Sequence, residues 1–333
     1  MISRRRRWLA VIGAVASLAL PGSAVFTQAL AQSTPMRFIV GLAAGGAVDP
    51  YARIIAEHMA KTLGRTIIVE NRPGAGGNIS AQVMTDAPAD GTLIWVGTQA
   101  LTEINPSVYS NLRWSIDDFV PLIKGVQAPL VLVAHPSVPA SNFGEFVAWS
   151  KGNRGKLTYS SYTAGTPSHL LGFLLNEKFD LDLTHVPYRG SGLQVTGLIA
   201  GHSLFGFAQV NSSAQQYAAG QLKAFGITSA ERWPAMKEVP TFAELGYPEL
   251  TTRVWFGLLV KTGTPSDIVA RLTDAAKAAH VDPGVRSKLE AQGYEVTGEI
   301  GPQLLPDIKI EIARWARIVN AAGFSAEDRG STR

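Results

Sequence analysis

The chain has 333 residues, with 30 lysines and arginines against 26 aspartates and glutamates, which gives a formal net charge of +4. Four arginines at residues 4–7 account for this excess, because the rest of the chain carries 26 basic and 26 acidic residues. Such a balance leaves no basic field for nucleic acid or for a membrane surface. Cysteine is absent, which excludes disulfides, thiolate metal sites and a cysteine nucleophile.

The N-terminal segment predicts export. A basic stretch at residues 3–7 precedes an apolar run at residues 8–20, which is shorter than the roughly 20 residues that a membrane-spanning helix needs. Residues 29–31, Ala-Leu-Ala, form a small-x-small cleavage site. We therefore expect a signal peptide at residues 1–31, cleaved after Ala31, and a mature protein in the periplasm. The arginine run is compatible with either Sec or twin-arginine export.

Strand-like and helix-like segments alternate along the rest of the chain. The predicted strands are residues 37–40, 66–69, 92–96, 130–134, 157–160, 183–186, 204–208, 224–227 and 254–260. The predicted helices are residues 50–63, 79–87, 143–151, 167–178, 192–200, 265–280, 283–292 and 302–322. This alternation predicts an α/β fold with mainly parallel sheets.

The mature length suits two lobes of ordinary domain size. No polar linker separates them, so the chain is expected to cross between the lobes on two apolar strands, residues 120–133 and 252–260. The predicted first lobe combines residues 32–125 with residues 256–333, and the second lobe is residues 126–255. The two crossover strands would then act as the hinge.

A glycine-rich loop at residues 41–49 follows the first predicted strand. Asp49 before Pro50 is typical of an N-cap before the first helical residue, so the helix is expected to start at Pro50. A helix start among small residues leaves amides that bind carboxylates or phosphates. The alternative is that Asp49 only caps the helix and the glycines only form a turn. The candidate ligand-binding residues of this loop are Gly45, Gly46, Ala47 and Asp49.

The segment at residues 160–169 repeats this pattern. A strand ends, hydroxyl-bearing residues follow, and Thr166 precedes a helix that is expected to start at Pro167. Two such loops, one in each predicted lobe, favour a cleft for a small ligand with carboxylates at both ends. The neutral donors here are Ser161, Thr163, Thr166 and Ser168. Ordinary capping is again the alternative, and His169 is either a ligand donor or a structural histidine.

Further candidates lie on two other loops and on the second crossover strand. Thr98 and Gln99 add polar side chains to a predicted loop at residues 97–102, and Arg189 is either a bidentate carboxylate ligand or a solvated arginine. Trp255 is placed to form an aromatic wall.

The chain has no Gly-x-Ser-x-Gly elbow, no His-Glu-x-x-His and no carboxylate cluster at metal spacing, so neither catalytic residues nor a metal is expected.

Five segments together resemble the Bug family, the periplasmic substrate-binding receptors of tripartite tricarboxylate transporters. They are VENRPGAGGN at 69–78, ADG at 89–91, INP at 104–106, HPS at 135–137 and HVPYRGS at 185–191, within a resemblance that spans residues 35–323. The resemblance implies a two-lobed type II periplasmic-binding-protein fold, a Venus flytrap, that closes on a small carboxylate. It also implies a permease as partner, with no cofactor and no enzymatic activity, and we expect a monomer that binds no nucleic acid.

The resemblance also implies roles for particular residues. Gly45, Gly46 and Asp49 match the first loop of the family, Thr98 matches the second, and the second-lobe pattern is matched by Ser161, Gly165, Ser168 and His169. In the family, the first-lobe loops hold one carboxylate partly through ordered waters, and a second-lobe helix N-terminus helps to hold the other end.

Two departures from the family pattern bear on the ligand. Tyr162 stands where a small residue is common, and Ala208 stands where many members have an aspartate. The missing acid removes a partner for a ligand amine or hydroxyl, and Tyr162 offers stacking to a ring. These departures favour an apolar or aromatic carboxylate over citrate or an amino acid.

Two other functions share the same features. One is a receptor that reports its ligand to a sensor kinase. The other is an enzyme on the same fold, for which Asp49 and His169 are the only acid–base pair, expected on opposite lobes and out of hydrogen-bond reach.

Overall fold

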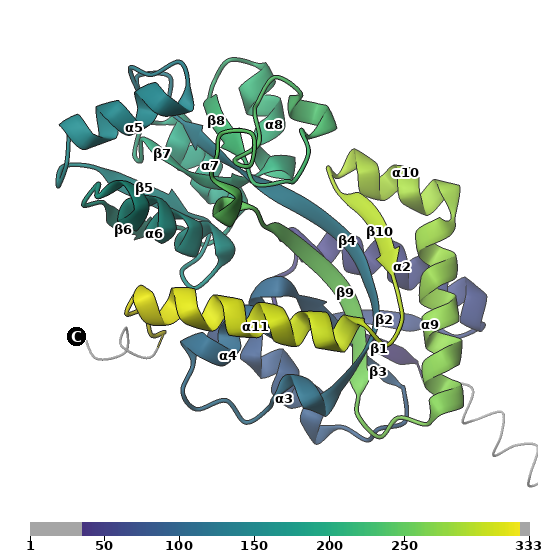
Figure 1. Ribbon diagram of the computed structural model, residues 1–333. Coiled ribbons are helices and arrows are strands. Elements are labelled where there is room, and N and C mark those ends of the chain that lie inside the picture. The colour runs from purple at the N-terminus through teal and green to yellow at the C-terminus, as the bar shows by residue number, and fades with distance from the viewer. Residues whose placement is uncertain (1–34, 327–333) are drawn as a thin grey trace, which may run out of the picture. The chain divides into compact units, whose positions relative to one another are not determined.

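This computed structural model describes residues 35–326. They form a fold built around a ten-stranded sheet (Figure 1). The main strand order is β2-β1-β3-β9-β4-β7-β5-β6, and β10 and β8 both pair with β4. The strands are β1 (Met36–Val40), β2 (Ile67–Asn71), β3 (Leu93–Thr98), β4 (Phe119–Ala134), β5 (Thr158–Ser161), β6 (Thr184–Pro187), β7 (Phe205–Gln209), β8 (Lys223–Ile227), β9 (Arg253–Lys261) and β10 (Glu295–Glu299).

Helices connect most of these strands. The α-helices are α2 (Val48–Leu63), α3 (Asn78–Asp86), α4 (Asn105–Val108), α5 (Phe143–Gly152), α6 (Pro167–Phe179), α7 (Ser191–Ile199), α8 (Val210–Ala218), α9 (Ser266–Val281), α10 (Pro283–Ala291) and α11 (Leu304–Ala321). A π-helix, η2 (Ala100–Ile104), follows β3, and short 3₁₀ turns are η1 (Ala75–Gly77), η3 (Ile116–Asp118), η4 (Pro234–Met236) and η5 (Pro248–Leu250).

Strand β4 joins the two halves of the sheet. From Phe119 to Pro129 it pairs with β9, and from Leu130 onward it pairs with β7 and β8. Because β4 and β9 are antiparallel neighbours, the chain passes between the halves on two adjacent strands, as predicted (Figure 1). The change of partners on β4 lies a few residues beyond residue 125, where the first lobe was expected to end, and the lobe boundaries themselves stay a prediction.

Each half keeps its apolar side chains between the sheet and the helices that cover it. On α2, the fully buried Tyr51, Ile55 and Met59 are spaced four residues apart and form one face against the sheet. Trp95 on β3 packs against Phe119 at a ring-centroid distance of 4.6 Å. Each such side chain contributes about 1.5–3 kcal/mol through burial, so these cores position the loops at the strand ends.

Most predicted elements are confirmed, with their ends shifted by a few residues, and the α/β prediction is correct. The expectation of mainly parallel sheets is wrong, because four strand pairs are parallel and five, each involving β4 or β9, are antiparallel. Helix α8 and strand β10 were not predicted, because both are mostly polar and each is recognisable only from its tertiary partners. Val296 is the buried residue of β10, and pairing with β4 supplies the rest of its stabilisation. The expected loop at residues 97–102 is wrong, since β3 continues to Thr98 and the π-helix starts at Ala100.

Two of the expectations concern export and membranes. The predicted signal peptide at residues 1–31 lies outside the described residues. Within residues 35–326, none of the helices combines the length and the apolar character that crossing a membrane requires.

Gly257 tests the pairing of β4 with β9. A Cβ atom at this position would lie 2.2 Å from the carbonyl oxygen of Ile123, which is backbone and cannot rotate away. We expect Gly257→Ala to lower the free energy of unfolding by about 1–3 kcal/mol, measured by urea denaturation. Gly152→Ala is the control, because a Cβ at the exposed end of α5 meets nothing within 4 Å. An equal effect of the two substitutions would contradict this close approach of the strands.

Candidate functional site

A pocket of about 520 Å³ lies where loops from both halves of the sheet meet. Its walls are formed by the loop before α2, the end of β3 with the π-helix, the loops before α6 and α7, and part of β9. Loops that follow parallel strands gather at the carboxyl edge of a sheet, which is where α/β proteins bind ligands. The volume lies within the range of about 300–1,000 Å³ that is usual for small-molecule sites.

The structure brings eight of the fourteen predicted site residues to this pocket. They are Gly45, Gly46, Ala47, Thr98, Tyr162, Gly165, Thr166 and Arg189. The other six do not line the pocket and are buried: Asp49, Gln99, Ser161, Ser168, His169 and Ala208. Most of these six position the loops that do line the pocket.

Asp49 is not the N-cap of α2. The helix begins one residue earlier, at Val48, so Asp49 lies in its first turn. Its carboxylate accepts hydrogen bonds from the Gly45 amide at 3.1 Å, from Asn71 Nδ2 at 3.1 Å and from Arg53 Nε at 3.0 Å. Burial alone would raise the pKa of Asp49, but these hydrogen bonds outweigh it and hold the pKa below its ordinary value. Asp49 therefore fixes the first loop as a buried, ionised carboxylate.

The loop before α6 brings Tyr162 and Thr166 to the pocket. Thr166 is the N-cap by its backbone, but its side chain does not cap the helix. The Thr166 hydroxyl instead donates a 2.6 Å hydrogen bond to the Thr163 carbonyl, and the phenol of Tyr162 lies close to Thr166 and Ser168. Burial raises the pKa of this phenol, so the hydroxyl stays neutral. Ligand binding at the helix start formed by residues 166–168 stays a prediction.

His169 supports the same loop from behind. Its Nδ1 accepts a hydrogen bond from the Gly165 amide at 3.2 Å, and its ring stacks on His185 at a centroid distance of 3.9 Å. His185 Nε2 lies 2.7 Å from Ser161 Oγ, which donates to the Thr163 carbonyl. These contacts support a structural role for His169 over a role as ligand donor. Ser161 belongs to the same buried network.

Two of the remaining predictions were off by one residue on a strand. Ala208 lies in the apolar core, and the adjacent Gln209 at the end of β7 lines the pocket. Trp255 was expected as an aromatic wall, but Phe256 lines the pocket and Trp255 faces away. Successive side chains of a strand point to opposite faces, so an error of one residue reverses the face.

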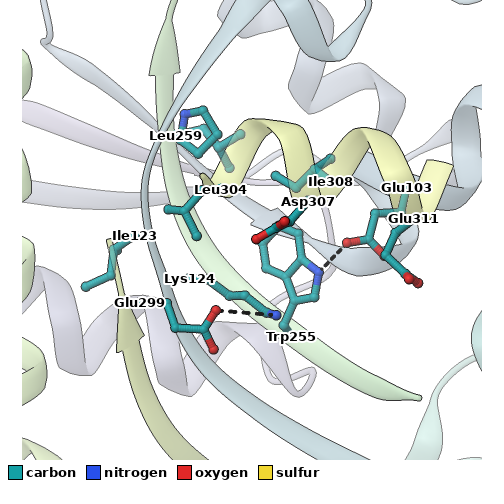
Figure 2. A pocket seen from close by; sticks show the side chains of 11 residues that line it. Glu103, Ile123, Lys124, Trp255, Leu259, Glu299, Leu304, Asp307, Ile308 and Glu311 are labelled. Atoms are coloured by element: carbon teal, nitrogen blue, oxygen red, sulfur yellow. Dashed lines mark hydrogen bonds and ion pairs between the residues drawn. The ribbon is translucent and has the colours of Figure 1, made fainter. Parts of the chain in front are cut away.

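Trp255 reaches a smaller cavity of about 50 Å³ on the other face of β9 (Figure 2). Its Nε1 donates a 2.7 Å hydrogen bond to Oε1 of Glu103, which is 3% exposed on the π-helix. Lys124 lies nearby and pairs with Glu299 at 3.7 Å. Burial raises the pKa of Glu103 to about 8, and the nearby negative charge of Glu311 acts in the same direction. The hydrogen bond from Trp255 opposes this rise but does not cancel it. Glu103 is therefore protonated at neutral pH.

Gln99 also belongs behind the pocket. Its Nε2 donates to Thr252 Oγ1 at 3.4 Å, and both side chains are buried. This contact links the end of β3 to the start of β9. Gln99 therefore contributes to the scaffold of the pocket.

Sequence reasoning missed much of the apolar wall. The additional lining side chains with apolar surface include Leu101, Val108, Tyr109, Leu193, Val254 and Phe256. The segment from the π-helix to the end of α4, which carries Leu101 and Val108, was not predicted as helical. The motif INP at residues 104–106 was the one available signal, because it lies within this segment.

Charge in the pocket is concentrated at one position. Arg189 is the only charged residue among those that line it, and its guanidinium makes no hydrogen bond or ion pair within residues 35–326. Among residues 35–326, no His, Asp or Glu lines the pocket. Nor does the described part of the chain contain a group of three or more such side chains that could hold a metal ion. The arrangement is suited to binding an organic anion.

The fold and the pocket are those of a two-lobed periplasmic binding protein, and comparison with known proteins identifies the family. The family described as "Tripartite tricarboxylate transporter family receptor" matches residues 51–324, so the chain belongs to it. A UPF0065 protein in the tcbD-tcbE intergenic region of Pseudomonas sp. (strain P51) is 34% identical over 320 residues, covering 95% of this chain and 94% of the relative. Protein BugT of Bordetella pertussis is 31% identical, covering 95% and 98%.

Solved structures of relatives have the same fold. The periplasmic binding protein BugD is 30% identical with a TM-score of 0.77, covering 87% of this chain and 98% of BugD. A protein of R. palustris with adipate is 28% identical with a TM-score of 0.79, and covers 87% and 98%. MatC from Rhodopseudomonas palustris with bound malate is 30% identical with a TM-score of 0.75, and covers 86% and 98%. The predicted fold class is confirmed.

Asp49→Asn tests the support of the first loop. Loss of the ionised acceptor is expected to lower the free energy of unfolding at pH 7 by about 1–3 kcal/mol. Because the folded-state pKa is depressed, the advantage of the wild type is full above the ordinary value of 3.8 and shrinks as pH falls through the lower folded pKa. Urea denaturation between pH 3 and pH 7 measures it. Asp267→Asn, in the exposed first turn of α9, is the control and is expected to cost less. Equal losses would contradict the role of Asp49.

Glu103→Gln tests the neutral acid behind the pocket. The unfolded chain releases this proton near pH 4.5 and the folded chain near about pH 8, so the stability of the wild type is expected to fall between these values. The Gln variant removes this slope and becomes more stable than the wild type by more than about 1 kcal/mol at pH 8. Glu299→Gln, a half-exposed residue of the same cavity, is expected to keep the slope. A wild type with no such slope would show that Glu103 is ionised.

Proposed function

We propose that this protein captures a small carboxylate in the 520 Å³ pocket and delivers it to the membrane permease of a tripartite tricarboxylate transporter. The observation that carries the proposal is the pocket itself, which draws its walls from both halves of the sheet and, among the described residues, contains a single charged side chain, Arg189. An arginine without a protein partner is suited to a bidentate carboxylate. The relatives solved with adipate and with malate support the same ligand class.

Closure of the pocket would depend on the two crossover strands. Val254 and Phe256 line the pocket from β9, and β9 pairs with β4 where β4 passes between the halves. A ligand held by loops of both halves would therefore favour a closed arrangement, which a permease can distinguish from the open one. Of the predicted residues, those that line the pocket are proposed to bind the ligand: Gly45, Gly46, Ala47, Thr98, Tyr162, Gly165, Thr166 and Arg189.

Binding without turnover is part of this proposal. The lining residues include no carboxylate, histidine or lysine to transfer a proton, and neither Asp49 nor His169 reaches the pocket. The chain is proposed to work in the periplasm, as relatives such as BugD do by description. The proposed export step uses residues 1–31, outside the described part of the chain.

A thermal-shift screen with mono-, di- and tricarboxylates, each beside its amide, tests the binding function. A ligand at about 100 times its Kd is expected to stabilise the protein by about 2.7 kcal/mol, with no shift from the amide and no product after prolonged incubation. A shift from a sugar or an amine, with none from any carboxylate, would overturn the proposal. Uptake of the binding carboxylate by cells with and without the receptor gene tests delivery to the permease, and unchanged uptake would favour a signalling role.

A further inference from the structure

We propose that residues 322–326, which follow α11, form a clasp that holds the two halves of the sheet together beside the ligand pocket, and that Phe324 makes its contact with the second half. Here the first half is the part of the sheet with β3 and β9, and the second half is the part with β5 and β7. The inference rests on the proposed function, because it concerns closure of the same pocket. It adds a residue outside the pocket wall to those that control binding.

Helix α11 packs against both halves. Ile308, near its start, belongs to an apolar cluster of the first half. Near its end, Trp315 and Val319 are buried in another apolar cluster, whose other members include Val108 of α4 and Leu170 of α6. Because α4 comes after β3 and α6 comes after β5, this second cluster joins the halves. Figure 1 shows α11 passing between α4 and α6.

The chain turns back directly after α11. Gly323 has a φ of 56°, in the left-handed region, and its amide donates to the Asn320 carbonyl at 3.1 Å. The Phe324 amide donates to the Val319 carbonyl at 3.3 Å. These two hydrogen bonds are those of a Schellman motif, in which the residue after the glycine packs back against the last turn of the helix. Phe324 packs against the cluster that contains Val319, so the helix end determines where its ring lies.

The Phe324 ring contacts the loop before α6, in the second half. It meets the ring of His169 edge to face, at a centroid distance of 4.7 Å and an interplanar angle of 76°. A Cβ atom at Gly165 would lie 3.2 Å from Phe324 Cε1 and 3.5 Å from Val108 Cγ1, so the Gly165 backbone lies against both side chains. Gly165 and Val108 line the ligand pocket from the second and the first half. Phe324 therefore packs directly behind the point where the two pocket walls meet.

The far end of the clasp is bound to the first half. The Ala326 amide donates a 3.1 Å hydrogen bond to the carbonyl of Val108, the last residue of α4. This bond attaches the clasp to α4, whereas the contact between Phe324 and His169 is lost when the halves separate. A contact made only in the closed arrangement shifts the population toward that arrangement. Because apparent affinity depends on the fraction of molecules in the binding arrangement, the clasp raises affinity without touching the ligand.

Pulsed electron–electron double resonance on the ligand-free protein tests the clasp. Because the chain has no cysteine, spin labels attach only at two introduced ones, Lys61→Cys on α2 in the first half and Ala148→Cys on α5 in the second. Both positions are exposed. The measurement gives the fraction of molecules at the label distance of the present arrangement, relative to all other distances. We expect Phe324→Ala to lower this ratio about 2- to 10-fold, the effect of losing one aromatic pair.

Leu305→Ala is the matched control, because Leu305 is a partly buried apolar residue of α11 that packs against the first-half cluster containing Ile308. It is expected to lower the melting temperature and to leave the distance distribution unchanged. Unchanged far-UV circular dichroism establishes that both variants fold. The wild-type distribution in Phe324→Ala would overturn the clasp, whichever carboxylate binds, because the measurement needs no ligand. Failure of every carboxylate in the thermal-shift screen would instead overturn the proposed function and leave this result intact.

Two truncations of the same labelled chain separate the clasp from the residues beyond it. Removal of residues 327–333 keeps Phe324 and the Ala326 amide, and is expected to leave the distance distribution as in the wild type. Removal of residues 324–333 is expected to reproduce the shift of Phe324→Ala. An equal shift with the shorter truncation would place the contact between the halves beyond residue 326 and would overturn the assignment to Phe324.

Discussion

The antiparallel pairing of β4 with β9 holds the two halves of the sheet together and positions the pocket between them. These two strands connect the halves of the sheet, and β9 also separates two cavities. Phe256 lines the ligand pocket on one face, and Trp255 reaches Glu103 on the other. Because neighbouring residues of one strand serve both cavities, a shift of register would disrupt the pocket wall and the buried hydrogen bond together. The close contact of Gly257 with the backbone of β4 holds this register.

The chemistry of the pocket depends on which backbone amides the chain satisfies by itself. A buried amide without a partner costs about 1–3 kcal/mol, so each helix start either finds an acceptor in the protein or remains available to a ligand. In the loop before α2, Asp49 supplies such an acceptor to the Gly45 amide. At α7 the first turn faces the pocket, where solvent or a ligand can satisfy it.

Glu103, on the far side of β9, helps to fix the position of the π-helix. It lies on the π-helix, whose other residues Ala100 and Leu101 line the ligand pocket. A neutral carboxyl can remain buried there with Trp255 as its partner, whereas an ionised one would need a cation that this cavity provides only in Lys124, already paired with Glu299. The protonated state of Glu103 is therefore part of what holds the π-helix against β9, and the geometry of the pocket wall depends on it.

Local patterns were enough to predict the α/β alternation, the two crossover strands, the loops that form the pocket and the family, because periodicity, capping residues and motifs are properties of short segments. Tertiary structure alone decided which side chains in those loops reach the pocket. Asp49 meets Asn71 from a strand 22 residues away, and Trp255 meets Glu103 across 152 residues. Ala208 lies in the core and its neighbour Gln209 lines the pocket, because successive side chains of β7 point to opposite faces of the sheet. Helix α8 and strand β10 are polar segments that their neighbours stabilise. Such contacts depend on packing between segments distant in the chain, which local patterns do not encode.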